Sequence, residues 1–251
     1  MADLALDLGV DGVELPVRDG FQITPENAAD TLPAAKDIFS EKGLAVAAVS
    51  ADPTDEIIQL MGDAEIPVLR VMVPVNMGQG YFKSVQSVKD KIISLGDVLR
   101  ANKVRIGIQN HHSYFIGSAV GVMDLIRDLP EDIAGAVPDF AHCQLSGEPV
   151  DMALDILNNR ILYMNLKNAV RELCPVSETQ DTVWQIRWTE GREGFCSWSS
   201  VVTELIKAEC LKDICLHAEY SDGKNLLEGD DVIPLIRRDI AYVKELLERY
   251  V

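Results

Sequence analysis

The sequence predicts an α/β fold, a (β/α)8 barrel in which parallel strands alternate with helices. Three observations support this prediction. The chain has 251 residues, close to the ~250 residues typical of one such barrel. Short apolar runs alternate with segments whose apolar residues recur at helical spacing. Polar residues that bind metals or transfer protons follow several of the apolar runs, and barrel active sites lie at the carboxyl ends of the strands.

The stretch from Lys103 to His142 shows the repeating unit most clearly. It contains two apolar runs, Val104–Gln109 and Ile133–Pro138, separated by Ser118–Leu129, which carries apolar residues at helical spacing. Polar groups follow each run: Asn110, His111 and His112 after the first, and Asp139 and His142 after the second. Strand, helix and strand, each strand ending in reactive groups, is the unit from which a (β/α) barrel is built.

Capping residues and apolar runs define the elements before this stretch. Thr24 as N-cap and Pro25 at the first helical position predict a helix that Gly43 closes. The unbroken apolar run Leu44–Ser50 is typical of a strand buried on both faces. Thr54 predicts the start of the next short helix. In order, the predicted elements are helix 1–8, strand 10–17, helix 25–43, strand 44–50, helix 54–64, strand 68–75 and helix 82–102.

The same alternation continues toward the C-terminus, with one interruption. The predicted elements are helix 149–157, strand 161–166, helix 198–208, strand 213–220 and helix 233–250. Residues 171–197 break the rhythm, and their VWQIRW segment alternates as the strands of a β-hairpin do. We therefore predict one domain over residues 1–251 with an inserted arm at about 171–197.

Seven strands are recognisable, and strict alternation with helices predicts that they are parallel. Strand 10–17 is preceded only by a short helix, so the first strand of a closed barrel has no counterpart. Unpaired buried backbone groups cost about 1–3 kcal/mol each. We therefore expect strands 10–17 and 213–220 to pair directly, or a neighbouring chain to fill the slot, or the natural protein to begin further upstream.

Composition excludes several classes of protein. The formal net charge is −17, from 23 basic and 40 acidic residues, and such a surface repels nucleic-acid backbones. The sequence has neither an apolar run of membrane-spanning length nor a signal peptide. Five cysteines, an odd number without a CxxC motif, predict free thiols in the reducing cytoplasm. A cytoplasmic protein with a small-molecule ligand is expected, without nucleic-acid or membrane partners; homo-oligomerisation stays open.

The alternation of side chains along strands predicts which groups meet inside the barrel. The inward set includes Gln109 and His111, above Gly107, whose missing side chain leaves room beneath them. It further includes Asn165, Lys167, His217 and Glu219, which converge with Asp139 at one mouth. In the alternative interpretation, Lys167 and Glu219 merely pair and the amides satisfy backbone groups at the strand ends.

Three further residues have two interpretations each. Glu14 either faces the ligand or is a buried partner of Arg70. Trp188 and Arg192, in or next to the predicted arm, either contact the ligand or form a packing lid. Because aromatic faces stack on the apolar faces of sugars, we favour ligand contact.

Six segments, in order, resemble the xylose-isomerase-like TIM barrels, which include sugar epimerases, inosose dehydratases and endonuclease IV. They are LGVDGVEL, IGIQNHH, VPDFAH, LYMNLKN, EGREGFCSW and ICLHAEYSD, and together they extend over nearly the whole chain. The resemblance implies a (β/α)8 barrel with a carbohydrate-type ligand.

The resemblance also implies a metal site from which this sequence departs. In the epimerases a divalent metal is held by Glu, Asp, His and Glu at the ends of the last four strands, and here those positions are Gln109, Asp139, Asn165 and His217. Only Asp139 is retained, so affinity for a hard divalent cation is expected to fall steeply. The cofactor is left undetermined. A shifted site for Zn or Mn, built from His111, Asp139, His142 and Glu219, stays open.

Two functions of different classes follow. The favoured one is a sugar isomerase or epimerase, or a related lyase, that removes a proton next to a carbonyl. Its base is His217 or Glu219, and Lys167 stabilises the enediolate oxygen. Its substrate-binding residues are Glu14, Gln109, His111, His142, Asn165, Trp188 and Arg192. The alternative is a sugar-binding barrel without catalysis; a DNA-repair nuclease is disfavoured by the acidic charge.

Overall fold

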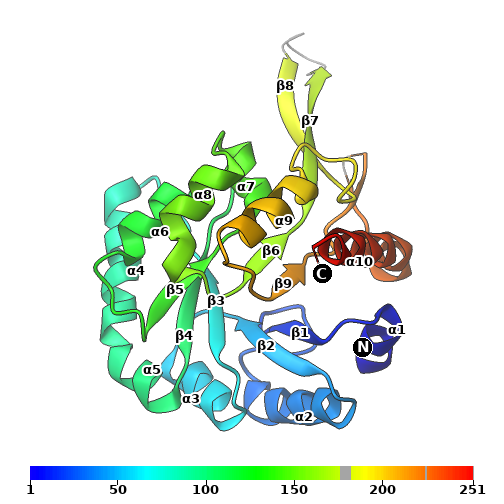
Figure 1. Cartoon of the computed structure of the whole chain (residues 1–251). Helices are drawn as coiled ribbons and strands as arrows, with labels where there is room; N and C mark the ends of the chain where they lie inside the picture. The colour runs from blue at the N-terminus through cyan, green and yellow to red at the C-terminus, as the bar shows by residue number, and fades with distance from the viewer. Residues whose placement is uncertain (176–181, 224, 251) are drawn as a thin grey trace.

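The computed structural model describes residues 1–175, 182–223 and 225–250, which fold as an α/β TIM barrel (Figure 1). Parallel strands form its wall, as the alternation with helices predicts. They are β1 (Gly12–Pro16), β2 (Ala45–Ser50), β3 (Val68–Met72), β4 (Arg105–Gln109), β5 (Ala134–Val137), β6 (Met164–Leu166) and β9 (Ile214–Leu216). The last of them is much shorter than the predicted strand 213–220, because regular pairing with β6 ends at Leu216.

The wall consists of two hydrogen-bonded sheets. The first has the order β1-β2-β3-β4-β5, and the second pairs β6 with β9. Two isolated parallel bridges, Ala136 with Ile161 and Asp139 with Asn165, join the sheets. No backbone hydrogen bond joins β1 to β9 among the described residues, so the direct pairing that was one of our three expectations is not found there.

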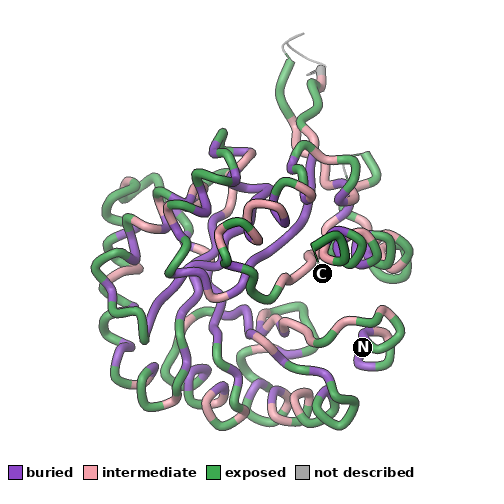
Figure 2. Tube along the Cα trace, viewed as in Figure 1, coloured by how far each residue is buried: buried purple, intermediate pink, exposed green. Residues whose placement is uncertain are grey.

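Helices cover the outside of the wall, and their buried faces line it (Figures 1 and 2). They are α1 (Ala2–Leu8), α2 (Ala28–Glu41), α3 (Asp55–Asp63), α4 (Tyr81–Ser94), α5 (Gly96–Asn102), α6 (Ala119–Ile126), α7 (Phe140–Leu145), α8 (Val150–Leu157), α9 (Trp198–Lys207) and α10 (Ile233–Glu248). Short 3₁₀ turns follow α8 (Asn158–Arg160) and precede α10 (Gly229–Val232).

Two helix predictions are corrected by the structure. The helix expected to begin at Pro25 begins at Ala28, because the Asn27 side chain accepts a hydrogen bond from the Thr24 N–H and closes a turn ahead of it. The single helix expected over 82–102 is two helices that meet at Leu95. Thr54 caps α3 as predicted, its hydroxyl accepting from the Ile57 N–H at 3.2 Å.

The inside of the barrel holds a small apolar layer of its own. Ala48, Val68, Val137 and Tyr163 pack together there, apart from the larger core between wall and helices. The space that Gly107 was expected to leave open is filled: a Cβ at this position would lie 2.6 Å from Val137 Cγ2 and 3.1 Å from Val68 Cγ1. This layer forms the floor beneath the polar groups at the strand ends.

Gly107→Ala is therefore expected to destabilise the protein by about 1–3 kcal/mol, the usual penalty for overpacking a filled core. Gly96→Ala is the matched control, since its Cβ would meet only Arg100 Nη1 at 3.4 Å and Ile133 Cδ1 at 3.8 Å. Urea unfolding of both variants measures the difference. Equal stability of the two variants would show that the layer above Gly107 yields easily.

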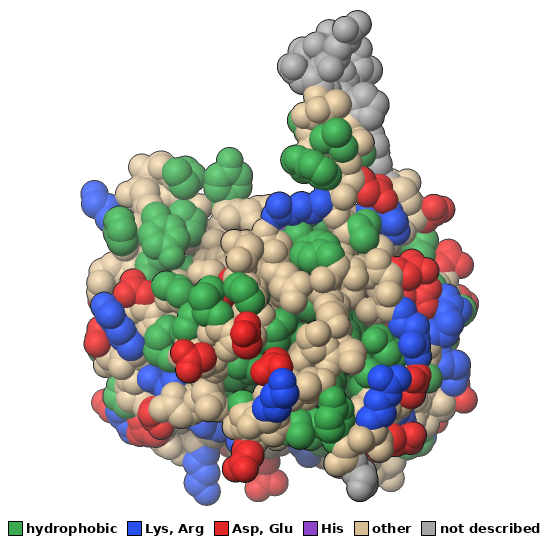
Figure 3. Space-filling model, turned by 45° about the horizontal axis from the view of Figure 1, so that its top comes forward, with side chains coloured by type: hydrophobic (Ala, Val, Ile, Leu, Met, Phe, Trp, Pro, Cys, Tyr) green, Lys and Arg blue, Asp and Glu red, His purple; other side chains and the backbone are tan. Residues whose placement is uncertain are grey.

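The interruption of the barrel rhythm is an antiparallel hairpin, as its alternation predicts. It pairs β7 (Asn168–Pro175) with β8 (Thr182–Thr189). Its base is buried against the barrel, and its outer part projects from it (Figures 1 and 3); residues 176–181 lie outside the described part. A two-residue pair, β10 (Ser221–Asp222) with β11 (Asn225–Leu226), follows β9.

Two general properties complete the fold. All five cysteines are free, and three of them are buried. Within the part of the chain that the structure describes, no helix has both the length and the apolar character needed to cross a membrane.

Candidate active site

Asp139 lies at the centre of the polar groups above the barrel floor. It is the N-cap of α7, and its Oδ1 accepts a hydrogen bond from the His142 N–H at 3.3 Å. Asn110, just after β4, fixes the Asp139 backbone from both sides: its Oδ1 accepts the Asp139 N–H at 2.8 Å, and its Nδ2 donates to the Asp139 carbonyl at 3.0 Å. All three side chains are fully buried, so the position of the carboxylate is set by two adjacent strand ends.

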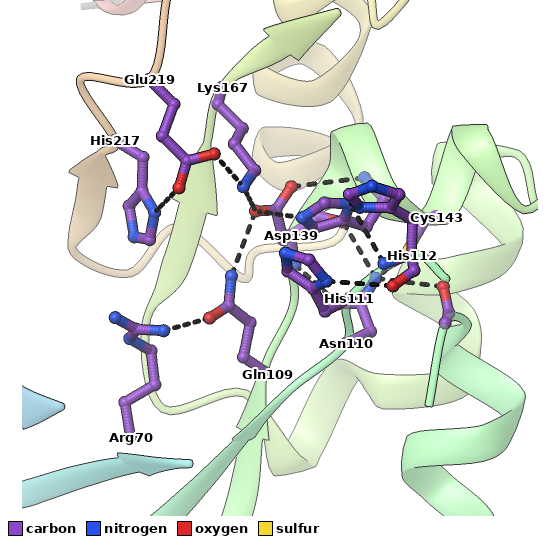
Figure 4. A network of polar contacts seen from close by, with 12 residues as sticks. Arg70, Gln109, Asn110, His111, His112, Asp139, Cys143, Lys167, His217 and Glu219 are labelled. Carbon is purple, nitrogen blue, oxygen red and sulfur yellow. Dashed lines mark hydrogen bonds and ion pairs between the residues drawn. The ribbon is translucent and has the colours of Figure 1, made fainter. Parts of the chain in front are cut away.

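Polar contacts join Arg70 and six of the predicted site residues into one chain across the mouth of the barrel, which Figure 4 shows from Arg70 onward. The chain runs in the order Glu14, Arg70, Gln109, Asp139, Lys167, Glu219 and His217. Gln109 Nε2 donates to Asp139 Oδ2 at 3.2 Å. Lys167 Nζ lies 2.8 Å from Glu219 Oε2 and 3.7 Å from Asp139 Oδ2. The Lys167–Glu219 pairing of the alternative interpretation is thus present.

Glu14 has the buried pairing that was one of its two interpretations. Its carboxylate accepts bonds from Arg70 Nε at 2.7 Å and Nη2 at 2.5 Å, and from the Tyr163 hydroxyl. Burial acts to raise the pKa of Glu14, but the hydrogen bonds and charge of Arg70 outweigh it and hold the pKa below its ordinary value. Glu14 is therefore an anion that orients Arg70.

Three histidines form a compact cluster beside Asp139. His111 and His112 follow β4, His142 lies in α7, and one ring nitrogen from each falls within 4.8 Å of the others. Burial lowers the pKa of all three: it is the largest cause for each, and the Lys167 charge adds to it. The pKa of His112 falls to about 4. All three imidazoles are therefore neutral at pH 7.

His217 faces the site from the opposite side, at the end of β9. Its Nδ1 lies 3.8 Å from Glu219 Oε1. Burial acts to raise the pKa of Glu219, whereas contact with His217 and the charge of Lys167 lower it, and the net result lies far below the ordinary value. Glu219 therefore stays ionised at neutral pH and orients the His217 ring. Its low pKa makes Glu219 itself a weak proton acceptor.

Several site residues carry buried polar atoms without a hydrogen-bond partner in the described residues. They are His142 Nε2, both side-chain polar atoms of Asn165, and His217 Nε2. Leaving such an atom unsatisfied costs about 1–3 kcal/mol. Their concentration at one mouth is typical of a site that binds a polar ligand.

The hairpin arm contributes one of its two predicted residues to this mouth. The Trp188 ring lies under the Lys167 ammonium, 4.4 Å from its centroid, and edge-on to His112 and His142 at 5.5 and 5.4 Å. Arg192 is placed elsewhere: its guanidinium pairs with Glu245 and stacks on Tyr242, both on α10. A cleft that includes Trp188, His112, Trp184 and Arg187 lies along the base of the arm.

The sequence comparison decides the family. The sequence model of the xylose isomerase-like TIM barrels matches residues 2–246. The chain belongs to this family. No curated protein matches the chain by sequence.

Solved structures with the same fold include two sugar epimerases and a probable dehydratase, all at low sequence identity. The 3-keto-D-glucoside 4-epimerase YcjR from E. coli superposes with a TM-score of 0.70 at 11% identity, over 97% of this chain and 92% of that one. D-psicose 3-epimerase gives 0.73 at 10% identity, over 98% and 92%. The probable 3-DHS dehydratase AsbF from Bacillus anthracis gives 0.68 at 13%, over 97% and 92%. At these identities the likeness establishes the fold alone.

The four positions to which the resemblance assigns a metal do not fit a divalent cation in this xylose isomerase-like barrel. The Gln109 amide donates a hydrogen bond to Asp139 Oδ2, and the Lys167 ammonium lies on the same oxygen. The Gln109 oxygen accepts a bond from Arg70 instead of facing the site. A cation beside Asp139 would meet an N–H donor and a positive charge where it needs anionic oxygens.

Some residues that shape the site were not singled out from the sequence. Tyr163 binds Glu14, and Asn168 holds the turn after the arm, donating to the Gly191 and Cys196 carbonyls at 2.8 and 2.7 Å. Asn168 follows Lys167 directly, so it anchors the strand end that carries the ammonium. In the sequence, the position of Asn168 in the LYMNLKN segment was the one feature that could have indicated its role.

Proposed function

We propose that the protein is a sugar isomerase or epimerase that moves a proton next to a carbonyl of a sugar or polyol-derived substrate. The observation that carries this proposal is the pair of His217 and Lys167. The unpartnered Nε2 of His217 and the buried Lys167 ammonium share Glu219. A base and a cation arranged in this way are what formation of an enediolate requires.

In this mechanism His217 Nε2 takes the proton from the carbon next to the carbonyl. The C–H electron pair moves into a C=C bond, and the former carbonyl oxygen becomes the enediolate oxygen. An ammonium has three donors, and Lys167 directs two toward Glu219 and Asp139, so its third is available to that oxygen. Glu219, held ionised, stabilises the imidazolium that forms. Reprotonation at the neighbouring carbon gives an isomer, and on the opposite face an epimer.

The remaining predicted site residues would bind and orient the substrate. Asn165, with both amide atoms unpartnered, would exchange hydrogen bonds with a sugar hydroxyl. Trp188 offers an aromatic surface at the same mouth, suited to the apolar face of a sugar ring. Arg192, paired with Glu245, would contribute only to a substrate that extends past the arm.

A second candidate function, a sugar-binding barrel without catalysis, is favoured by two observations. Glu219 and Glu14 are both held as anions by cationic partners, and the family metal positions do not fit a metal. His217 is then the single base, and without a metal the carbonyl would be polarised by Lys167 alone. Measurements of proton exchange and of binding separate the two functions.

The test follows deuterium incorporation by NMR in D₂O. D-fructose, D-psicose and D-tagatose are the first panel, since sugars of this kind bind to structural neighbours. Wild type is expected to exchange the hydrogen next to the carbonyl, and His217→Asn is expected to lose about 10²–10⁴-fold of that rate, the range for removing a general base. Lys207→Gln, on the exposed face of α9, is the control and should keep the rate. Sugar binding without any exchange would establish the second candidate instead.

A further inference from the structure

The histidine cluster beside the proposed catalytic groups has the geometry of a metal site. His112 Nδ1 lies 3.2 Å from His142 Nδ1, and one nitrogen of His111 completes a group that lies within 4.8 Å. Zinc–nitrogen bonds are about 2.0–2.1 Å long and tetrahedral, which places two nitrogen ligands of one ion roughly 3.3 Å apart. The closest pair in the cluster already has this separation.

The inward nitrogens of His112 and His142 share one proton across the 3.2 Å contact between their Nδ1 atoms. Movement of that proton to the outer nitrogen of His112 frees both lone pairs for a metal. His111 Nδ1 lies 3.0 Å from the His112 carbonyl; a carbonyl only accepts, so this nitrogen carries the proton and Nε2 holds a lone pair. His142 Nδ1 accepts a long bond of 3.3 Å from the His112 N–H, so its proton is on Nε2. That nitrogen faces Asp139 Oδ2 at 3.7 Å.

This places Asp139 behind His142, not in a ligand position. A carboxylate that receives the outer N–H of a metal-binding histidine fixes its tautomer and increases its basicity. His142 and Asp139 are both fully buried, and the His142 Nε2 proton has no acceptor within hydrogen-bond distance among the described residues.

Aromatic side chains surround the cluster. Phe115 packs edge-on against His111 at 4.9 Å between ring centroids, and Trp188 packs edge-on against His112 and His142. Oxygen ligands, which magnesium and calcium need, are not among the three inward groups. Three neutral imidazoles with an open fourth position suit zinc and similar transition metals.

We propose that His111, His112 and His142 form a zinc-type metal site with Asp139 as the carboxylate behind His142. The site shares no direct ligand with the four positions that the resemblance assigns to a metal. It also stands apart from the proposed isomerase function, because zinc binding to the protein alone tests it. An ion there would lie on the His142 side of Asp139, across the mouth from His217.

The test is a calorimetric titration with Zn²⁺ alone. The protein carries no polyhistidine tag and is first treated with a chelator to remove bound metal. One ion per chain is expected. His112→Gln and His142→Ala are each expected to weaken binding by more than 100-fold, beyond the 10–100-fold typical of a group behind the ligand. Asp139→Asn should fall within that smaller range. His112 is only partly buried, so His112→Gln remains informative if the fully buried His142 cannot be replaced without unfolding.

The fourth histidine provides the matched control. His217→Ala removes an imidazole at one of the family metal positions but not from the cluster, and zinc affinity should stay within about twofold. Loss of binding in His217→Ala would place the ion at the family positions, and retention in His112→Gln would place it outside the cluster; either result would overturn the proposal. Absence of binding up to millimolar Zn²⁺ would overturn it as well.

Discussion

Lys167→Met is expected to lower the free energy of unfolding by about 3–5 kcal/mol, the range for removing one partner of a buried ion pair. Lys167 is 2% exposed, and its ammonium faces two carboxylates, Glu219 at 2.8 Å and Asp139 at 3.7 Å. Without it, the fully buried Asp139 carboxylate keeps two hydrogen bonds, from the Gln109 amide and the backbone N–H of His142. Methionine retains much of the apolar stem of lysine, so the loss of stability measures the removal of the ammonium charge. Urea unfolding at pH 7 measures it.

The matched control is Lys207→Met. Lys207 pairs with Glu204 at 2.7 Å on the surface of α9, with 65% of its side chain exposed. Exposed pairs of this kind contribute about 0–1 kcal/mol. If both lysine variants lost less than 1 kcal/mol, Lys167 would not be the counter-ion that holds the site together.

Arg70→Met is expected to produce a loss of similar size, about 3–5 kcal/mol at pH 7, with a distinctive pH dependence. In the wild type the pKa of Glu14 lies below its ordinary value of 4.5. Its contribution to stability is therefore present above that value and is lost as the pH falls. In the variant, Arg70 no longer offsets burial, the largest influence on Glu14, and the Tyr163 hydroxyl and His217 are the weaker groups left to lower its pKa. The pKa of Glu14 then rises, so stability is lost as the pH rises. The gap between the two proteins should widen from pH 4 to pH 7.

Urea unfolding at both pH values measures this gap, and the double variant Glu14→Gln with Arg70→Met is the control. Removing the carboxylate charge as well should restore part of the stability and flatten the pH dependence, because no buried charge is left unpaired. If the difference in unfolding free energy between wild type and Arg70→Met stayed constant from pH 4 to pH 7, the ionised Glu14 would not be the cause of the destabilisation.

The sequence predicted the barrel better than it predicted the site. Apolar runs placed strands from β1 to β6 because a buried parallel strand is marked by local composition. The helix over 82–102 was predicted without its break, since the apolar spacing continues through Leu95. Side-chain alternation brought Gln109, Asn165 and Lys167 to one mouth, because the period of a strand is fixed by its backbone.

The rest of the site depends on contacts between distant segments. The reach of Arg70 from β3 to both Glu14 and Gln109, and the clamp of Asn110 on Asp139, arise from the packing of neighbouring strand ends. Adjacent residues such as His111 and His112 alternate in direction on a strand, so their convergence is a property of the loop. Arg192 was predicted to bind substrate because of its residue type, and nothing in the neighbouring sequence indicates its contact with α10.

The boundary between the two sheets of the wall, here called the seam, is where a bound ligand can affect the stability of the barrel. Gln109 and Asp139 belong to the five-stranded side, whereas Asn165 and His217 belong to the β6–β9 side, and two isolated bridges connect the sides. A ligand that bonds to residues of both sides is a cross-link over this seam. A ligand that binds more tightly when the seam is closed therefore stabilises the closed wall by the same free energy.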